Sequence, residues 1–133
     1  MTTPSLSSPA VARPRLVTVL LWLMRIALTG MFLGAGFSKL AGEPVMVEMF
    51  EIIGMGQWLR YFVGACEVAG AVGVLVPRVS VLAAAGLALL MVGASVANVT
   101  VLDTSPATTI VIFLVALLTA WLGLRRTSRR NAP

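Results

Sequence analysis

Four long apolar runs dominate the sequence, and each is close to the length that crosses a lipid bilayer as a helix. They occupy residues 16–37, 61–76, 79–101 and 107–124. A helix rises about 1.5 Å per residue and the hydrocarbon core is about 30 Å thick, so about twenty apolar residues make one crossing. The pattern predicts an all-α protein, a four-transmembrane-helix bundle whose membrane domain covers residues 15–125.

A short amphipathic helix is predicted in the first loop, which spans residues 38–60 and is the longest loop of the chain. Within residues 44–53, apolar side chains recur at helical spacing, and acidic side chains occupy the other side. The apolar set is Val45, Met46, Met49, Phe50 and Ile53, and the acidic set is Glu43, Glu48 and Glu51. We expect this helix to lie at the outer membrane surface. The alternative is a loop that packs on the bundle.

The basic residues predict the orientation of the bundle. Four crossings place both termini on one side, together with Arg13, Arg15, Arg78, Arg125, Arg126, Arg129 and Arg130. The opposite side has only Lys39 and Arg60, and nearly all the acids. The positive-inside rule therefore predicts a multi-pass protein of the bacterial plasma (inner) membrane with both termini in the cytoplasm.

Residues 1–14 are then expected to form a disordered cytoplasmic tail, and residues 126–133 a basic cytoplasmic tail. A cleaved secretory signal peptide is the competing interpretation of the N-terminal segment. It fits less well, because the apolar run exceeds a typical signal sequence and contains Arg25.

Composition supports this class of protein. Hydrophobic residues make up 59% of the 133 residues, charged residues only 11%, and the mean hydropathy is +0.98. The net charge of +5 does not indicate nucleic acid as a partner, because the basic residues flank apolar spans. Cys66 is the single cysteine and histidine is absent, so the chain predicts no disulfide and no metal site. Any cofactor is expected to be organic and not covalently bound, or to belong to a partner protein.

Two charged residues, Arg25 and Glu67, interrupt apolar runs and need partners inside the membrane. Arg25 comes ten residues after Arg15, and Glu67 comes eleven residues before Arg78. If the flanking arginines lie at one membrane face, both charges lie about 15 Å deep. We therefore expect an ion pair between Arg25 and Glu67 that joins the first two spans.

Polar residues also define one face on each of these two helices. On the first span the face contains Arg25, Thr29, Phe32, Gly36 and Lys39, and on the second Arg60, Gly64, Glu67, Ala71 and Val74. If the faces meet, Lys39, Arg60, Glu67 and Arg25 form an inward polar track with Tyr61 and Trp58 near its mouth. Asn98 on the third span is expected to hydrogen-bond across helices.

This track has two interpretations, and neither assigns a catalytic residue. It can line a cavity for an amphipathic or anionic ligand such as a quinone head group, with arginine and lysine donating to carbonyl oxygens and Glu67 exchanging a proton. It can equally be a buried salt bridge that fixes helix register without any ligand.

Several short segments resemble the DoxX-like family of small four-helix bacterial membrane proteins. They are Arg25, residues 34–40 (GAGFSKL), Gly54 to Gly56, residues 64–70 (GACEVAG) and residues 74–78 (VLVPR). The resemblance covers about residues 25–98, and Arg25, Lys39 and Glu67 match polar positions of the family. It implies likeness to the membrane subunit of a thiosulfate to quinone oxidoreductase, or a link to quinone detoxification. The soluble extension of larger members has no counterpart here, which argues against autonomous catalysis.

The leading hypothesis is an oxidoreductase subunit that binds a quinone or a similar lipid-soluble ligand between its helices and supports a membrane or peripheral redox partner. The alternative is a non-enzymatic chaperone or assembly factor. Such a protein would grip another membrane protein through small-residue faces such as Gly30 and Gly34 and through the helix at residues 44–53. A third hypothesis is a small transporter, which would require a homo-oligomer.

Overall fold

The computed structural model describes residues 13–130, with side chains for residues 15–128, and in this part of the chain it has five helices and no strand. The helices are α1 (Arg13–Ala41), α2 (Pro44–Ile53), α3 (Gln57–Leu75), α4 (Ser80–Thr100) and α5 (Ala107–Arg130). All but α2 are long and apolar enough to span a membrane. The predicted fold class, a four-helix bundle with a short helix in the first loop, is confirmed. Most of the expected N-terminal tail, residues 1–14, lies outside the described residues.

The first loop is much shorter than predicted. Helix α1 continues through Ala41 and α3 begins at Gln57, so Lys39 and Arg60 lie in helical turns and not in a loop. Hydropathy marks the end of a span at the first charged residue. The backbone can nevertheless stay helical there, because a long basic side chain can pack its stem along the helix and extend its charge beyond the apolar part. Similarly, α5 continues through Arg130, beyond the apolar run that ends at residue 124.

Helix α2 has the bounds that the sequence predicts. Pro44 occupies its first turn, where a missing backbone N–H is tolerated, and Gly54 ends it in the left-handed conformation with φ 77°. Phe50 is buried beneath the helix, while Glu48 and Glu51 are exposed. The apolar and acidic faces of α2 are therefore those predicted. The location of α2 at the membrane surface remains a prediction.

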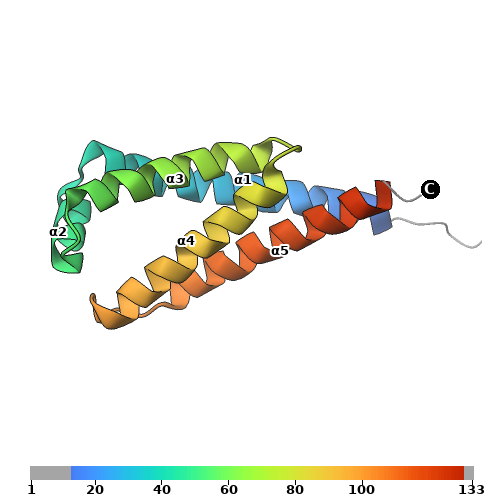
Figure 1. Cartoon of the computed structure of the whole chain (residues 1–133). Helices are drawn as coiled ribbons and strands as arrows, with labels where there is room; N and C mark the ends of the chain where they lie inside the picture. Colours follow the sequence, from blue (N-terminus) through green and yellow to red (C-terminus); the bar gives the residue numbers. More distant parts are fainter. Residues whose placement is uncertain (1–12, 131–133) are drawn as a thin grey trace, which may run out of the picture.

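The spanning helices form two pairs, α1 with α3 and α4 with α5, each packed closely together. The pairs converge where α1 begins and α5 ends, which we call the terminal end, and diverge towards the end that carries α2 (Figure 1). The core between them is made of small and medium apolar side chains. They are Leu28, Phe32, Ala71, Val74, Ala84, Leu87, Ala88, Met91, Ala116 and Ala120.

Helices α1 and α3 approach most closely at Gly36 and Gly64. A Cβ on Gly36 would lie 2.9 Å from the backbone oxygen of Gly64 and 2.7 Å from Val68, and one on Gly64 would lie 3.1 Å from the backbone oxygen of Gly36. Only glycine permits this distance between backbones. Gly30 and Gly34 are exposed instead, with no protein atom within 4 Å of the position a Cβ would take.

We predict that Gly36→Leu separates the two helices, whereas Gly34→Leu, two residues away on the exposed face, does not. Both variants gain the same helix propensity, so their difference isolates the contact. Overpacking should lower the free energy of unfolding of Gly36→Leu by about 1–3 kcal/mol relative to Gly34→Leu. Titration of the purified protein with sodium dodecyl sulfate, followed by circular dichroism, measures this difference. Equal stability of the two variants would contradict the contact.

Candidate functional site

An ion pair between Lys39 and Glu67 connects α1 to α3. Lys39 Nζ lies 2.9 Å from Glu67 Oε2 and donates a hydrogen bond to Oε1, 3.1 Å away. It also donates to the backbone oxygen of Ala35 at 3.4 Å. The Glu67 side chain is only 4% exposed. A carboxylate buried so deeply needs this counter-charge, and the pair therefore holds α1 and α3 in one register.

The predicted ion pair between Arg25 and Glu67 was wrong, because Arg25 lies at a different level of the bundle. Thr29 Oγ1 donates to the backbone oxygen of Ala71 at 3.0 Å, so these residues are level. Arg25 is one turn further towards the terminal end, level with the last turn of α3. There its Nη2 donates to Ser80 Oγ, at the start of α4, over 2.9 Å.

The depth estimate failed because its two reference arginines are not at one level. Arg15 precedes Arg25 by ten residues, so it lies about 15 Å further along the axis of α1. Arg78, in contrast, follows α3 directly and lies close to Ser80 in the connecting turn. Counting from two arginines at different levels therefore placed Arg25 and Glu67 at the same depth, although they lie in different layers of the bundle.

Arg60 extends the polar contacts to α2. Its Nε donates to Gln57 Oε1 over 2.7 Å, its Nη1 donates to the backbone oxygen of Lys39, and its guanidinium carbon lies 4.2 Å from the ring centroid of Tyr61. Gln57 Nε2 in turn donates to the backbone oxygen of Val47 in α2 at 3.0 Å. We call Lys39, Gln57, Arg60 and Glu67 the polar cluster. Sequence reasoning missed Gln57, although its spacing of three residues from Arg60 places both on one helix face.

The predicted polar faces are otherwise correct. The buried residues of α3 are Arg60, Gly64, Glu67, Ala71 and Val74, and on α1 Arg25, Thr29, Phe32 and Gly36 are buried while Lys39 is partly buried. The faces meet, but the structure brings together Lys39, Arg60 and Glu67 without Arg25.

The remaining candidates lie outside the polar cluster. Trp58 and Tyr61 are 61% and 51% exposed on the first turns of α3. Asn98 is partly buried, and its backbone oxygen accepts a hydrogen bond from Thr104 N at 2.9 Å. The side-chain hydrogen bond that joins α4 to α5 runs from Ser95 Oγ to Thr109 Oγ1 over 2.8 Å.

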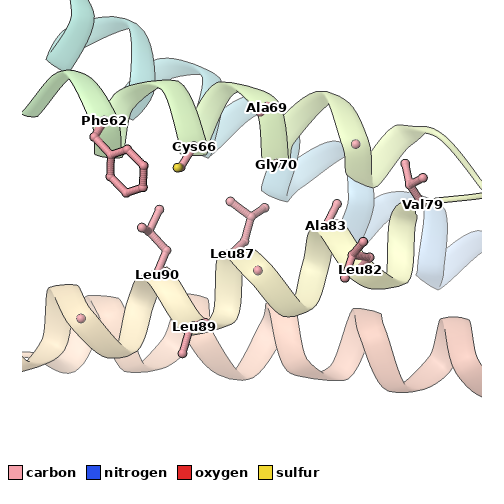
Figure 2. Close-up of a pocket in the computed structure, with 13 residues that line it drawn as sticks. Phe62, Cys66, Ala69, Gly70, Val79, Leu82, Ala83, Leu87, Leu89 and Leu90 are labelled. Atoms are coloured by element: carbon pink, nitrogen blue, oxygen red, sulfur yellow. The ribbon is translucent and has the colours of Figure 1, made fainter. Parts of the chain in front are cut away.

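A groove lies between α3 and α4, whereas a cavity was expected between the polar faces of α1 and α3, which are in contact at Gly36 and Gly64. The contact at Gly36 and Gly64 brings the backbones of α1 and α3 together. Between α3 and α4, glycines such as Gly86 and Gly93 carry no side chain and leave space. The groove has a volume of about 590 Å³. Figure 2 shows Phe62 and Cys66 of α3 facing Leu87 and Leu90 of α4 across it. The other lining residues are Ala69, Gly70, Gly73, Val79, Leu82, Ala83, Gly86, Leu89 and Gly93.

The two features lie on different faces of α3. Glu67 points towards α1, while Cys66, its neighbour in sequence, lines the groove towards α4. Successive residues of a helix are about 100° apart, which accounts for this separation. The polar cluster therefore fixes the position of α3, and the groove offers an apolar space of the size that small-molecule ligands occupy.

Four apolar spans, with ionisable groups restricted to helix interfaces and helix ends, define a multi-pass α-helical membrane protein. The DoxX-like family model matches residues 23–122, so the chain belongs to the DoxX-like family and is an integral membrane protein. The matched region contains Arg25, the polar cluster and the groove. Comparison with curated proteins finds no match, and neither does comparison with solved structures.

We predict strong energetic coupling between Lys39 and Glu67. Lys39→Met leaves a buried carboxylate without its counter-charge and should lower the free energy of unfolding by about 3–5 kcal/mol. Adding Glu67→Met removes that carboxylate, so the double variant should lose less than the sum of the single losses. A double-mutant cycle, measured by titration with sodium dodecyl sulfate, should give a coupling energy of roughly 1–3 kcal/mol.

Arg25→Met combined with Glu67→Met provides the matched control. These residues contact different partners, so their effects should add within about 0.5 kcal/mol. A coupling energy between Arg25 and Glu67 as large as that between Lys39 and Glu67 would support an Arg25–Glu67 ion pair and contradict the register described above.

Proposed function

We propose that the protein is a membrane subunit that binds a quinone in the groove between α3 and α4 and works beside a redox partner. The observation that carries this proposal is the groove itself, about 590 Å³ of apolar space between α3 and α4 that opens to the surface of the bundle. An isoprenoid chain is apolar and flexible, and it can enter such a groove directly from the bilayer.

Aromatic residues next to the groove suit the ring of the quinone. Phe62 lines the groove, and the Trp58 ring centroid lies 6.4 Å from that of Phe62. Aromatic side chains favour offset or edge contacts with another planar ring. The exposed Trp58 indole and Tyr61 hydroxyl can donate hydrogen bonds to the quinone carbonyl oxygens.

The polar cluster has a positioning role in this proposal. Lys39 is engaged by Glu67, and Arg60 by Gln57 and the end of α1, so these donors hold helices together. Arg60 also stacks on Tyr61, which orients the first turns of α3 where the aromatic residues lie. Arg25 is not part of the proposed head-group site, because it contacts Ser80, beyond the last turn of α3 and far from the aromatic residues on the first turns of that helix.

A bound quinone supplies the electron-accepting chemistry, and the partner is a separate membrane or peripheral protein. Helix α2 directly precedes the aromatic turns of α3 and exposes Glu48 and Glu51. This acidic surface is where we place the docking of that partner.

The alternative function, a chaperone or assembly factor, is supported by Gly30 and Gly34. Both are exposed on α1 with open space around them, which allows a helix of another protein to approach closely. In that case the groove would need no ligand, and the bound protein would cover α1.

One pair of variants separates these functions. Gly86→Phe places a ring inside the groove, and Gly30→Phe places the same ring on the exposed face of α1; neither position has a protein atom within 4 Å of the new Cβ. We expect Gly86→Phe to reduce the quinone that copurifies in mild detergent by about tenfold, because the ring occupies the space of the tail. Gly30→Phe should retain it. Extraction and chromatography of quinones measure both.

Unchanged quinone content in Gly86→Phe would contradict quinone binding in the groove. If, in addition, Gly30→Phe lost a copurifying membrane protein, the assembly function would be favoured. Circular dichroism of both variants verifies that the helices remain folded.

We also propose that both termini face the cytoplasm of a bacterial cell, since the basic residues gather at the terminal end. In a Cys66→Ala background, Glu48→Cys should react in intact cells with a membrane-impermeant maleimide, because α2 then faces outward. Ser128→Cys should react only after the cells are opened. Both positions are exposed, so access to the thiol decides the result. Reversed labelling would contradict the orientation.

A further inference from the structure

Two arginine side chains of limited exposure lie on the neighbouring helices α1 and α5, from the level of the turn between α3 and α4 towards the terminal end of the bundle. Arg25 of α1 is 7% exposed, and Arg126 of α5 is partly buried. Helices α1, α4 and α5 converge in this region (Figure 1). Gly123, three residues before Arg126, lies against Val81 of α4, and Arg25 contacts the preceding residue, Ser80, so the two arginines belong to the same region of the bundle.

Their identified hydrogen-bond partners are uncharged. Arg25 donates to Ser80 Oγ, whose hydroxyl also donates to the backbone oxygen of Pro77, and Arg126 donates to Thr18 Oγ1. The ring of Trp22 lies 5.2 Å from the guanidinium carbon of Arg25 and adds a weak cation–π contact. Neutral oxygens satisfy hydrogen bonds, but they do not neutralise two positive charges inside an apolar bundle.

No acidic residue of the chain is placed to neutralise them. All five acids belong to other parts of the sequence: Glu43, Glu48 and Glu51 next to or within α2, Glu67 in its pair with Lys39, and Asp103 between α4 and α5. The connection that holds Asp103 and the helix α2 both lie at the end of the bundle opposite to the arginines (Figure 1). None of the acidic side chains of the chain therefore supplies a counter-charge, and we look for it in a ligand.

Arg25 also retains an unused donor. Its Nε is buried and has no hydrogen-bond partner among the described residues. An unpaired buried N–H of a charged group is unfavourable, and the guanidinium fork matches the geometry of phosphate oxygens. The unused donor, the positive charge and the position of Arg25 thus all favour an anionic ligand with phosphate oxygens.

We propose that Arg25 and Arg126 form an internal binding site for a phosphate group, supplied by the head group of an anionic phospholipid in the leaflet at the terminal end. The neighbouring surface favours a lipid over a soluble anion, because Trp22, Trp121 and Leu124 are exposed apolar side chains in the same region. Arg125, by contrast, stacks on Trp121 with its guanidinium carbon 3.7 Å from the ring centroid, so it faces the surface and not the interior.

The test compares lipids bound to the purified full chain by native mass spectrometry in mild detergent. Phosphatidylglycerol and phosphatidylcholine with identical acyl chains are offered in turn. The wild type should retain phosphatidylglycerol preferentially, and Arg25→Gln and Arg126→Gln should each reduce its retention by about tenfold or more. Arg125→Gln removes the same charge from the outer surface and should change retention by less than about twofold.

Further arms make the outcome decisive. Millimolar inorganic phosphate should leave phosphatidylglycerol bound; its displacement would assign the site to a soluble phosphate and overturn the lipid source. Equal retention by wild type, Arg25→Gln and Arg126→Gln would overturn the site itself. If Arg25→Gln loses its helical circular dichroism, the more exposed Arg126→Gln, compared with Arg125→Gln, carries the test.

Discussion

The close approach of α1 and α3 at Gly36 and Gly64 is the constraint on which the other contacts depend. With no side chains between them, the two backbones come near enough for Lys39 to reach Glu67 on the facing helix, and for Thr29 to donate to a backbone oxygen one layer further along. That spacing sets the register of the pair. The register in turn places Arg25 beyond the last turn of α3, where it meets Ser80 of the next helix.

Hydrophobic periodicity predicted which face of each helix is buried, but not how the faces slide against one another. The buried set of α3 contains Arg60, Glu67 and the small residues between them, as the sequence indicates, and α2 begins and ends where expected. Periodicity is a property of one helix, whereas register belongs to a pair. Flanking arginines were poor markers of depth, because α1 extends well beyond the turn that follows α3.

The location of the groove was equally inaccessible to sequence reasoning. Glycine permits both a tight contact and an open space, and the difference depends on what the neighbouring helix presents. A Cβ on Gly70 would lie 2.5 Å from Leu87, while one on Gly86 would meet nothing within 4 Å, although both residues line the same groove. A large facing side chain fills the space beside Gly70. The diverging axes of the two helix pairs, visible in Figure 1, are a property of the assembled fold.

The two ends of the bundle manage buried charge in opposite ways. Near α2, each cation has partners within the chain: Glu67 neutralises Lys39, while Gln57 and a backbone oxygen bind Arg60. Towards the terminal end, the acceptors of Arg25 and Arg126 among the described residues are hydroxyl groups, and Arg25 also contacts the Trp22 ring. A low-dielectric interior penalises that arrangement unless an anion accompanies it. In the proposed phosphate site, an anionic lipid head group at the membrane surface supplies that anion. Arg126 then belongs both to the basic set that we propose orients the protein and to the proposed phosphate site.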